Sequence, residues 1–379
     1  MKTIESLFLL RGKKLLLLFP CVLVLCLFSC SVTGEEGDGS DDGLESVWEG
    51  SETDLSANGT ANCYIVPTKG SYAFKATIQG NSSDKLNGTP DHAEVLWESF
   101  GTTDNINPGD LIKDVAFKDG YIVFTHDNYN HGNAAIAIMD SGNKILWSWH
   151  IWLDNSKDLK YNNDAGTMME KNLGAVSNNK DGVLYQWGRK DPFPKYVSTN
   201  TSTAWPREEI SDATTGTIEF TIENPMILLE DCGKGDWLFT ERNNLDNTRW
   251  TASKSKYDPC PPGYRIPDGG PNGIWSKALG DNPKDSERKV YGRRYPYSGV
   301  PVLANGNSDF YQIHGKDDDS NRGGGSKYWS CTPASGSQMY VLSVYSRVLD
   351  SAGNFYEGYH TQYTEEKYFE CHPVRCQKQ

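Results

Sequence analysis

A short acidic segment, KDDDSNRGGG at 316–325, carries the side chains best suited to binding a metal ion. It offers the carboxylate and amide oxygens that Ca²⁺ prefers, from Asp317, Asp318, Asp319 and Asn321. Glycine stands one position later than in an EF-hand loop, so the spacing also fits a mobile acidic loop that binds no metal. The loop is therefore the favoured interpretation, with a calcium site as the alternative, and the sequence points to no other cofactor.

The other residues with catalytic potential form no recognisable catalytic set. The sequence shows no Ser, His and Asp in the order of a known catalytic triad, no phosphate-binding loop and no pair of carboxylates in a recognisable catalytic motif. His150, in ILWSWHIW at 145–152, has no second histidine at a metal-ligand spacing, so we expect a half-buried, hydrogen-bonded side chain. Tyr185, Trp187 and Arg189 could form a sugar-stacking platform, but sheet core with Arg189 paired to an acid is the favoured interpretation. The pattern favours binding over catalysis.

The cysteines divide into an N-terminal group and a group that could form disulfides. Cys21 and Cys26 lie in an apolar N-terminal run, which Cys30 follows. The six others permit three bridges in 15 possible pairings: Cys63, Cys232, Cys260, Cys331, Cys371 and Cys376. No C-x-x-C occurs, and the one C-x₄-C has no partner pair, which argues against zinc.

The N-terminus predicts export and anchoring. Residues 1–29 have the basic start and short apolar run of a signal peptide. Leu27-Phe28-Ser29-Cys30 resembles a bacterial lipobox, so Cys30 is the expected site of lipid attachment; an ordinary secretory signal is the alternative. Residues 30–60 are predicted to be a flexible acidic tether, because they contain too few aliphatic residues to fold. The expected location is the outer membrane, lipid-anchored and surface-exposed.

Charge and composition limit the classes of molecule that this protein is expected to bind. The chain has 37 basic and 50 acidic residues, a net charge of −13, which argues against nucleic acid and against a polybasic membrane patch. Aromatic residues make up 12% and glycine contributes 37 residues, which suits β-rich, loop-rich domains. The length that remains after the tether predicts two domains.

The first predicted domain spans 61–155 and reads as a β-sandwich. Alternating apolar and polar residues predict five to seven strands, including a hairpin of 133–139 and 144–152. We expect the tryptophans of this hairpin to face the sandwich core and to approach the next domain. ANCYIV and GNAAIAIMDSGNKILWSWHIW resemble a domain of Bacteroidetes fimbrillin-like lipoproteins. The expected fold is an immunoglobulin-like sandwich.

The second predicted domain spans 156–379, with an insertion at 196–256. Its ordered motifs LYQWGRKDP, YDPCPPGYRIP, RRYPYSGV, YWSCTPASG and HPVRC resemble the FISUMP (major paralogous) domain, a relative of the C-type-lectin-like fold. The resemblance implies an α+β domain with a short helix and a small antiparallel sheet. This sequence departs from the family where DGGPNG follows the proline-rich segment, so we expect the helix to begin late and to be short. The Glu-Pro-Asn, Gln-Pro-Asp and Trp-Asn-Asp calcium tripeptides of C-type lectins are absent.

The resemblance also implies a disulfide pattern. In a lectin-like fold the segment before the first helix lies beside the last strand, which places Cys260 next to Cys376. Cys331 and Cys371 depart from the family, which usually has other residues at these positions, and we expect them to form a private second pair near the closing strands. Cys63 and Cys232, in different predicted domains, would then be left free. The resemblance further implies a cell-surface adhesin or pilus-associated tip protein that recognises glycan or protein ligands and contacts pilus subunits. The alternative is a carbohydrate-processing accessory protein or an enzyme on the lectin-like fold.

Overall fold

The computed structural model describes residues 50–101, 106–127, 131–161, 164–177, 182–194, 207–240, 246–279, 303–304, 307–308, 325–334, 338–349 and 355–379. The predicted signal peptide, Cys30 and the candidate calcium residues Asp317, Asp318, Asp319 and Asn321 lie outside these ranges. The described chain is β-rich, and Ser46–Gln379 forms one compact unit. None of the helices in the described ranges has the length and apolar character needed to cross a membrane.

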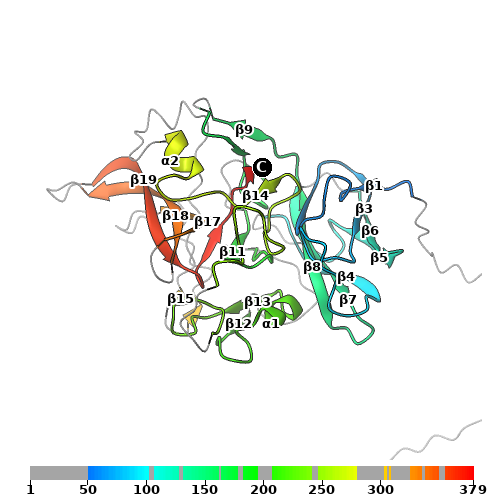
Figure 1. Ribbon diagram of the computed structural model, residues 1–379. Helices are drawn as coiled ribbons and strands as arrows, with labels where there is room; N and C mark the ends of the chain where they lie inside the picture. The colour runs from blue at the N-terminus through cyan, green and yellow to red at the C-terminus, as the bar shows by residue number, and fades with distance from the viewer. Residues whose placement is uncertain are drawn as a thin grey trace, which may run out of the picture. The chain divides into compact units, whose positions relative to one another are not determined.

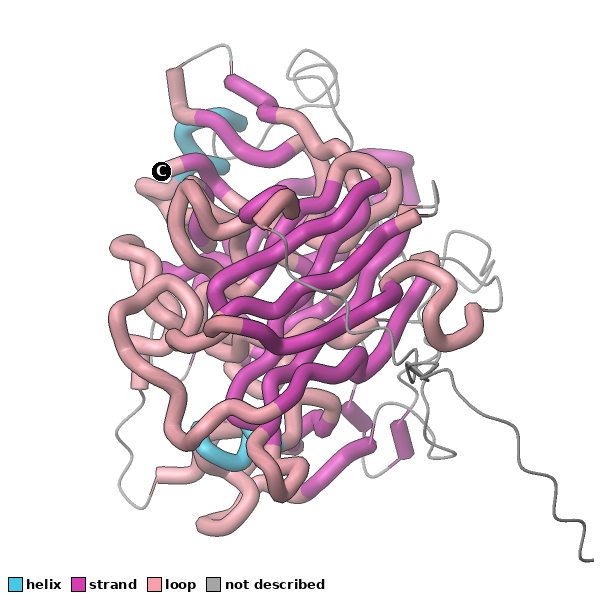
Figure 2. Tube along the Cα trace, turned by 90° about the vertical axis from the view of Figure 1, so that its right-hand side faces the viewer, coloured by secondary structure: helices cyan, strands magenta, loops and turns pink. Residues whose placement is uncertain are grey.

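Eight of the described strands form two four-stranded sheets in the first part of the chain (Figures 1 and 2). One sheet has the order β1 (Thr53–Asp54), β3 (Gly70–Lys75), β6 (Tyr121–His126), β5 (Lys113–Lys118). The other has the order β2 (Cys63–Val66), β8 (Ile145–Leu153), β7 (Gly132–Met139), β4 (His92–Ser99). The β1–β3 and β2–β8 pairs are parallel, and the other pairs are antiparallel. The predicted hairpin is confirmed as β7–β8.

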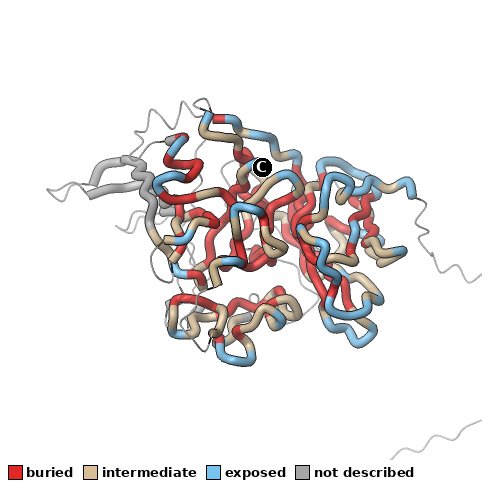
Figure 3. Tube along the Cα trace, in the orientation of Figure 1, coloured by how far each residue is buried: buried red, intermediate tan, exposed pale blue. Residues whose placement is uncertain are grey.

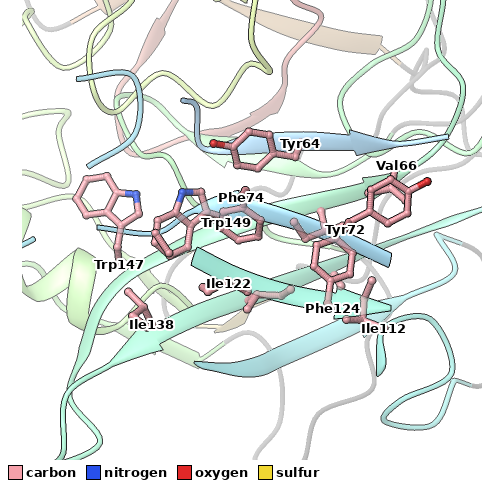
Figure 4. Packing of buried hydrophobic residues seen from close by; sticks show 14 of the residues in the cluster. Tyr64, Val66, Tyr72, Phe74, Ile112, Ile122, Phe124, Ile138, Trp147 and Trp149 are labelled. Atoms are coloured by element: carbon pink, nitrogen blue, oxygen red, sulfur yellow. The ribbon is translucent and has the colours of Figure 1, made fainter. Parts of the chain in front are cut away.

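The core between these two sheets combines aliphatic side chains with a group of aromatic rings, and the tryptophans of the hairpin belong to it as predicted (Figure 4). Trp149 of β8 packs against Phe74 of β3, with ring centroids 5.2 Å apart. Trp147 and Ile151 belong to the same buried cluster. The turn after β7 is fixed by the Asp140 carboxylate, which accepts hydrogen bonds from the backbone N–H groups at positions 142 and 144. Burial of this aromatic cluster is the main force that closes the sandwich.

The opposite face of β8 is also buried. Ser148, His150 and Trp152 are at most 3% exposed. Trp152 and the neighbouring Cys63 of β2 join a second hydrophobic cluster, which contains Trp187 and other residues from beyond position 156. The sequence predicted this approach to the following domain, and Figure 3 shows β8 buried along its length. The two predicted domains therefore share a core.

The remaining chain contributes short sheets around that second core. A four-stranded sheet has the order β14 (Tyr264–Arg265), β21 (Gln377–Lys378), β10 (Thr167–Met169), β9 (Asp158–Lys160). Three two-stranded sheets pair β11 (Leu184–Gln186) with β20 (Cys371–Pro373), β12 (Arg207–Glu209) with β13 (Ile227–Leu229), and β15 (Leu303–Ala304) with β16 (Asn307–Ser308). A three-stranded sheet has the order β17 (Gly325–Pro333), β18 (Gln338–Leu349), β19 (Phe355–Lys367). The β12–β13 pair, from the predicted insertion, is parallel.

Two short helices complete the described elements. Helix α1 (Ile218–Glu223) begins at Thr217, whose hydroxyl accepts a hydrogen bond from the Phe220 N–H at 3.0 Å. This N-cap satisfies one of the backbone donors that a helix start leaves unpaired. Helix α2 (Ile274–Leu279) follows the glycine-rich segment DGGPNG, which confirms the prediction of a late and short helix.

One disulfide, Cys260–Cys376, joins residues 116 apart in the chain, as the resemblance implied. Strand β21 lies between β14 and β10, which places the C-terminal end beside the segment that follows Cys260. The expected Cys331–Cys371 bridge is wrong, because both side chains are free thiols in separate hydrophobic clusters. The Cys331 sulfur lies 3.8 Å from Asp268 Oδ1, whereas Cys371 is buried among apolar residues around Leu184.

Candidate functional site

His150 is a structural residue at the buried boundary between β8 and the following domain. Its Nε2 lies 2.9 Å from Asn133 Oδ1, and its Nδ1 lies 3.3 Å from the Tyr185 hydroxyl. Asn133 donates through its amide to the Gly174 carbonyl at 2.9 Å, so Nε2 carries the imidazole proton. Burial lowers the pKa of His150 to about 3. The ring is neutral and hydrogen-bonded, as predicted, but it is fully rather than half buried.

Ser148, Lys190 and Asp191 have the composition of a serine–lysine catalytic pair, but they are closed to substrate. The Ser148 hydroxyl donates to Asp191 Oδ1 at 2.6 Å, and Lys190 Nζ contacts both side chains. Lys190 also lies 4.7 Å from the Trp147 ring centroid, and burial lowers its pKa. All three side chains are at most 4% exposed. The group is a buried ion pair that fixes β8 against the next domain.

The sugar-stacking interpretation of Tyr185, Trp187 and Arg189 is wrong, because all three are buried. Trp187 donates to the Ser330 carbonyl at 3.0 Å. Arg189 donates to carbonyl oxygens, including that of Ile227 at 2.6 Å, so its expected acidic partner is replaced by backbone and amide acceptors. Burial lowers the pKa of Arg189 to about 10. The core interpretation is confirmed.

Arg249 has the acidic partner that Arg189 lacks. Its guanidinium donates two hydrogen bonds to the Asp236 carboxylate. Three aromatic rings surround it, with centroids 4.8–5.2 Å from its guanidinium carbon: Trp187, Trp237 and Tyr368. Two more of its five donors go to the carbonyl oxygens of Asp246 and Trp187, and the side chain is buried, so this guanidinium is closed to a ligand.

A polar pocket lies where the loop after β13 meets the paired ends of β18 and β19. It has a volume of about 420 Å³ and is lined by Asp231, Gly233, Lys234, Gly235, Gln338 and Lys367. Gln338 and Lys367 are register partners in the β18–β19 ladder. The pocket therefore combines side chains from a sheet, which provides a rigid floor, with groups from a short loop. We call these six residues the polar pocket.

The loop of the polar pocket is held in shape by one carboxylate. Asp231 Oδ1 accepts hydrogen bonds from the backbone N–H groups of Gly233, Lys234 and Gly235 at 2.7–2.9 Å. Gly233 and Gly235 have φ angles of +87° and +81°, which residues with a Cβ adopt at a cost. The sequence DCGKGD at 231–236 thus encodes a preformed turn that presents the Lys234 side chain.

The electrostatics around the polar pocket are mixed. The Lys234 ammonium donates to the Thr240 carbonyl and lies 5.8 Å from the Phe239 ring centroid. Lys327 of β17 forms an ion pair with Glu366 of β19. Beside them, burial and then the charge of Glu366 raise the pKa of Glu370 to about 7, although Lys327 and Lys367 oppose the rise. A carboxyl group next to this pocket is therefore half ionised near neutral pH.

Metal binding has no support from the part of the chain that the structure describes. Those residues include no group of three or more His, Cys, Asp or Glu side chains that could hold an ion. The candidate calcium residues Asp317, Asp318, Asp319 and Asn321 lie outside the described ranges, and so does Cys30.

The sequence reasoning missed the polar pocket. Its loop falls in the segment interpreted as an insertion, and Gln338 and Lys367 are ordinary polar residues at strand ends. The one available signal was DCGKGD, in which an aspartate and two glycines directly follow the apolar strand of MILLE. Comparison with known proteins found no matching family, no matching curated protein and no matching solved structure.

Proposed function

We propose that this protein is a lipid-anchored cell-surface protein of the adhesin or pilus-tip type that binds a glycan or protein ligand through the polar pocket. The observation that carries the proposal is the contrast between this pocket and the interior. The buried ions around Ser148 and Asp236 saturate one another, whereas Lys367 is exposed at an open pocket beside the preformed loop at 231–235. Preformed loops and exposed polar side chains on a rigid sheet are typical of binding sites.

The proposed architecture joins a lipid anchor to the folded part of the chain through a tether. Lipidation at Cys30 and a tether over 30–60 would attach the chain to the outer membrane with the folded part at the cell surface. We assign 61–155 to an immunoglobulin-like sandwich of the fimbrillin-like type and 156–379 to a C-type-lectin-like FISUMP domain. The Cys260–Cys376 bridge and the β14–β21–β10 order support the second assignment. Pilus subunits are the proposed assembly partners.

The binding proposal is tested on a glycan and surface-protein array with the full chain and two matched variants. Lys367→Gln removes the exposed ammonium from the pocket, and Lys85→Gln removes an exposed ammonium from the sandwich. We expect Lys367→Gln to weaken binding at least tenfold and Lys85→Gln to leave it unchanged. Equal binding by all three proteins would place the ligand elsewhere. Mass spectrometry of membrane-extracted protein tests the anchor, and an unmodified Cys30 would refute it.

A second candidate function, glycan cleavage, is favoured by the two carboxyl groups near the pocket. Glu370 has a pKa raised to about 7, whereas Glu366 is paired with Lys327. Glycoside hydrolases use one carboxyl group with a raised pKa as the general acid, together with a second carboxylate. Release of reducing sugars that is lost in both Glu370→Gln and Glu366→Gln would support an enzyme. Binding without release would favour the adhesin.

A further inference from the structure

Six charged groups lie at the polar pocket or next to its lining, and their signs balance. Lys234, Lys367 and Asp231 line the pocket. Lys327 and Glu366 form an ion pair, and both act electrostatically on Glu370, as Lys367 and Asp231 do. The six groups come from the loop after β13, from β17, from β19 and from the turn that joins β19 to β20. The cluster is neutral when all six are ionised and carries one net positive charge when one carboxyl is protonated.

Two of the three carboxylates are already satisfied. Asp231 Oδ1 accepts three backbone N–H groups of its own loop, and Glu366 is paired with Lys327. Two of the lysines, Lys234 and Lys367, line the pocket. Lys234 keeps one donor on the Thr240 carbonyl, and Lys367 lies with its ammonium 5.8 Å from the Phe369 ring centroid. An ammonium has three donors, so one carbonyl or one ring does not exhaust it.

We propose that the polar pocket binds an anionic group, a carboxylate or a sulfate ester carried by a saccharide, at Lys234 and Lys367. The inference rests on the proposed function, since it names the ligand class and the regulation of the same pocket. The lining supports an anion because, among the residues that the structure describes there, Lys234 and Lys367 contribute two side-chain cations and the one carboxylate, that of Asp231, accepts hydrogen bonds from its own backbone.

The pH dependence follows from the environment of Glu370. Burial and the neighbouring charges of Glu366 and Asp231 raise its pKa to about 7, and Lys327 and Lys367 limit the rise. At pH 8.5 Glu370 carries a charge that repels an anion, and at pH 5.5 it does not. For charges about 7 Å apart at an effective dielectric constant of about 50, Coulomb's law gives roughly a fivefold change in affinity. Binding of an anion should therefore tighten as the pH falls.

The test is isothermal titration of the full chain with three trisaccharides at pH 5.5, 7.0 and 8.5. One is galacturonic acid, which carries carboxylates, one is a galactose trisaccharide with sulfate esters, and one is neutral galactose. We expect at least one anionic trisaccharide to bind, more tightly than the neutral one, and about fivefold more tightly at pH 5.5 than at pH 8.5. Binding of only one anionic trisaccharide identifies carboxylate or sulfate as the recognised group.

Variants separate the local effect from net charge. Glu370→Gln should bind the anionic trisaccharide at pH 8.5 as tightly as the unmodified protein does at pH 5.5, with no further change on acidification. Glu94→Gln, which removes an exposed carboxylate from the sandwich strand β4, should keep the fivefold pH change. Equal affinity for neutral and anionic trisaccharides would overturn the inference and leave the proposed function standing. Failure of both anionic trisaccharides to bind would also overturn it, and an unchanged pH dependence in Glu370→Gln would refute the part assigned to Glu370.

Discussion

Replacing His150 by glutamine should remove a large part of the acid sensitivity of the fold. The histidine ring is fully buried, and its two nitrogens are bonded to Asn133 and Tyr185. Glutamine offers the same two functions, an amide donor for Asn133 and a carbonyl acceptor for the Tyr185 hydroxyl, but it does not titrate. The substitution therefore changes the response to pH while keeping the hydrogen-bond pattern.

The magnitude follows from the difference in His150 pKa between the folded and unfolded states. Burial lowers the folded pKa to about 3, while the unfolded value stays near the ordinary 6.5. The folded state then binds fewer protons than the unfolded state between these values, so stability is present above pH 6.5 and is lost as the pH falls. Between pH 7 and pH 4.5, proton linkage at His150 costs about 2–3 kcal/mol of unfolding free energy.

Urea unfolding followed by tryptophan fluorescence measures this difference. The unmodified protein and His150→Gln should be compared from pH 7 to pH 4.5 with the disulfide intact, because other groups also titrate. Burial lowers the pKa of His372, which adds to the acid loss, and raises the pKa of Asp258 to about 6, which opposes it. These contributions cancel between the two proteins. Parallel curves of unfolding free energy against pH would refute the assigned environment of His150.

Three further outcomes are expected. Replacing Cys376 by serine should lower the unfolding free energy by about 4–5 kcal/mol in the chain-entropy account, because the bridge to Cys260 spans 116 residues; a midpoint in urea within error of the unmodified protein would contradict it. Replacing Asp191 by asparagine leaves the Lys190 ammonium buried without its carboxylate, which should cost about 3–5 kcal/mol; thermal unfolding gives the value, and Asp84→Asn, which breaks an exposed ion pair, is the matched control with little effect. Chelation of calcium should leave the melting temperature unchanged, since the second core is closed by apolar packing and a disulfide; a fall of many degrees would show that a calcium ion supports the fold.

The local parts of the fold were predictable because their signals are local. Alternation in ILWSWHIW and the turn residues before it predicted the β7–β8 hairpin, and the aromatic face indicated the sandwich core. DGGPNG predicted a late start for α2, because glycine and proline disfavour a helix there. Each of these inferences needed only a dozen neighbouring residues.

The errors concern contacts between distant segments. Cys331 and Cys371 were expected to pair because both lie near closing strands, but they face different hydrophobic clusters. Arg189 was expected to pair with an acidic side chain, but it donates a hydrogen bond to the carbonyl oxygen of Ile227, which lies in the predicted insertion. The polar pocket joins a loop near position 233 to strand ends more than 100 residues later, and no periodicity in the sequence encodes that meeting.

The polar residues on β8 explain why this strand adopts one register although both of its faces are buried. A shift by one residue would exchange the faces and place Ser148 and His150 beside Phe74 in the apolar core. Each would lose buried hydrogen-bond partners, at a cost of about 1–3 kcal/mol per unsatisfied group. The shift would also remove Trp149 from the aromatic cluster. A wholly apolar β8 could pack against both neighbours, but a shift of its register would leave no polar group without a partner. The polar residues on β8 therefore specify its register. Through the register, they also fix how the chain after residue 156 packs against the sandwich.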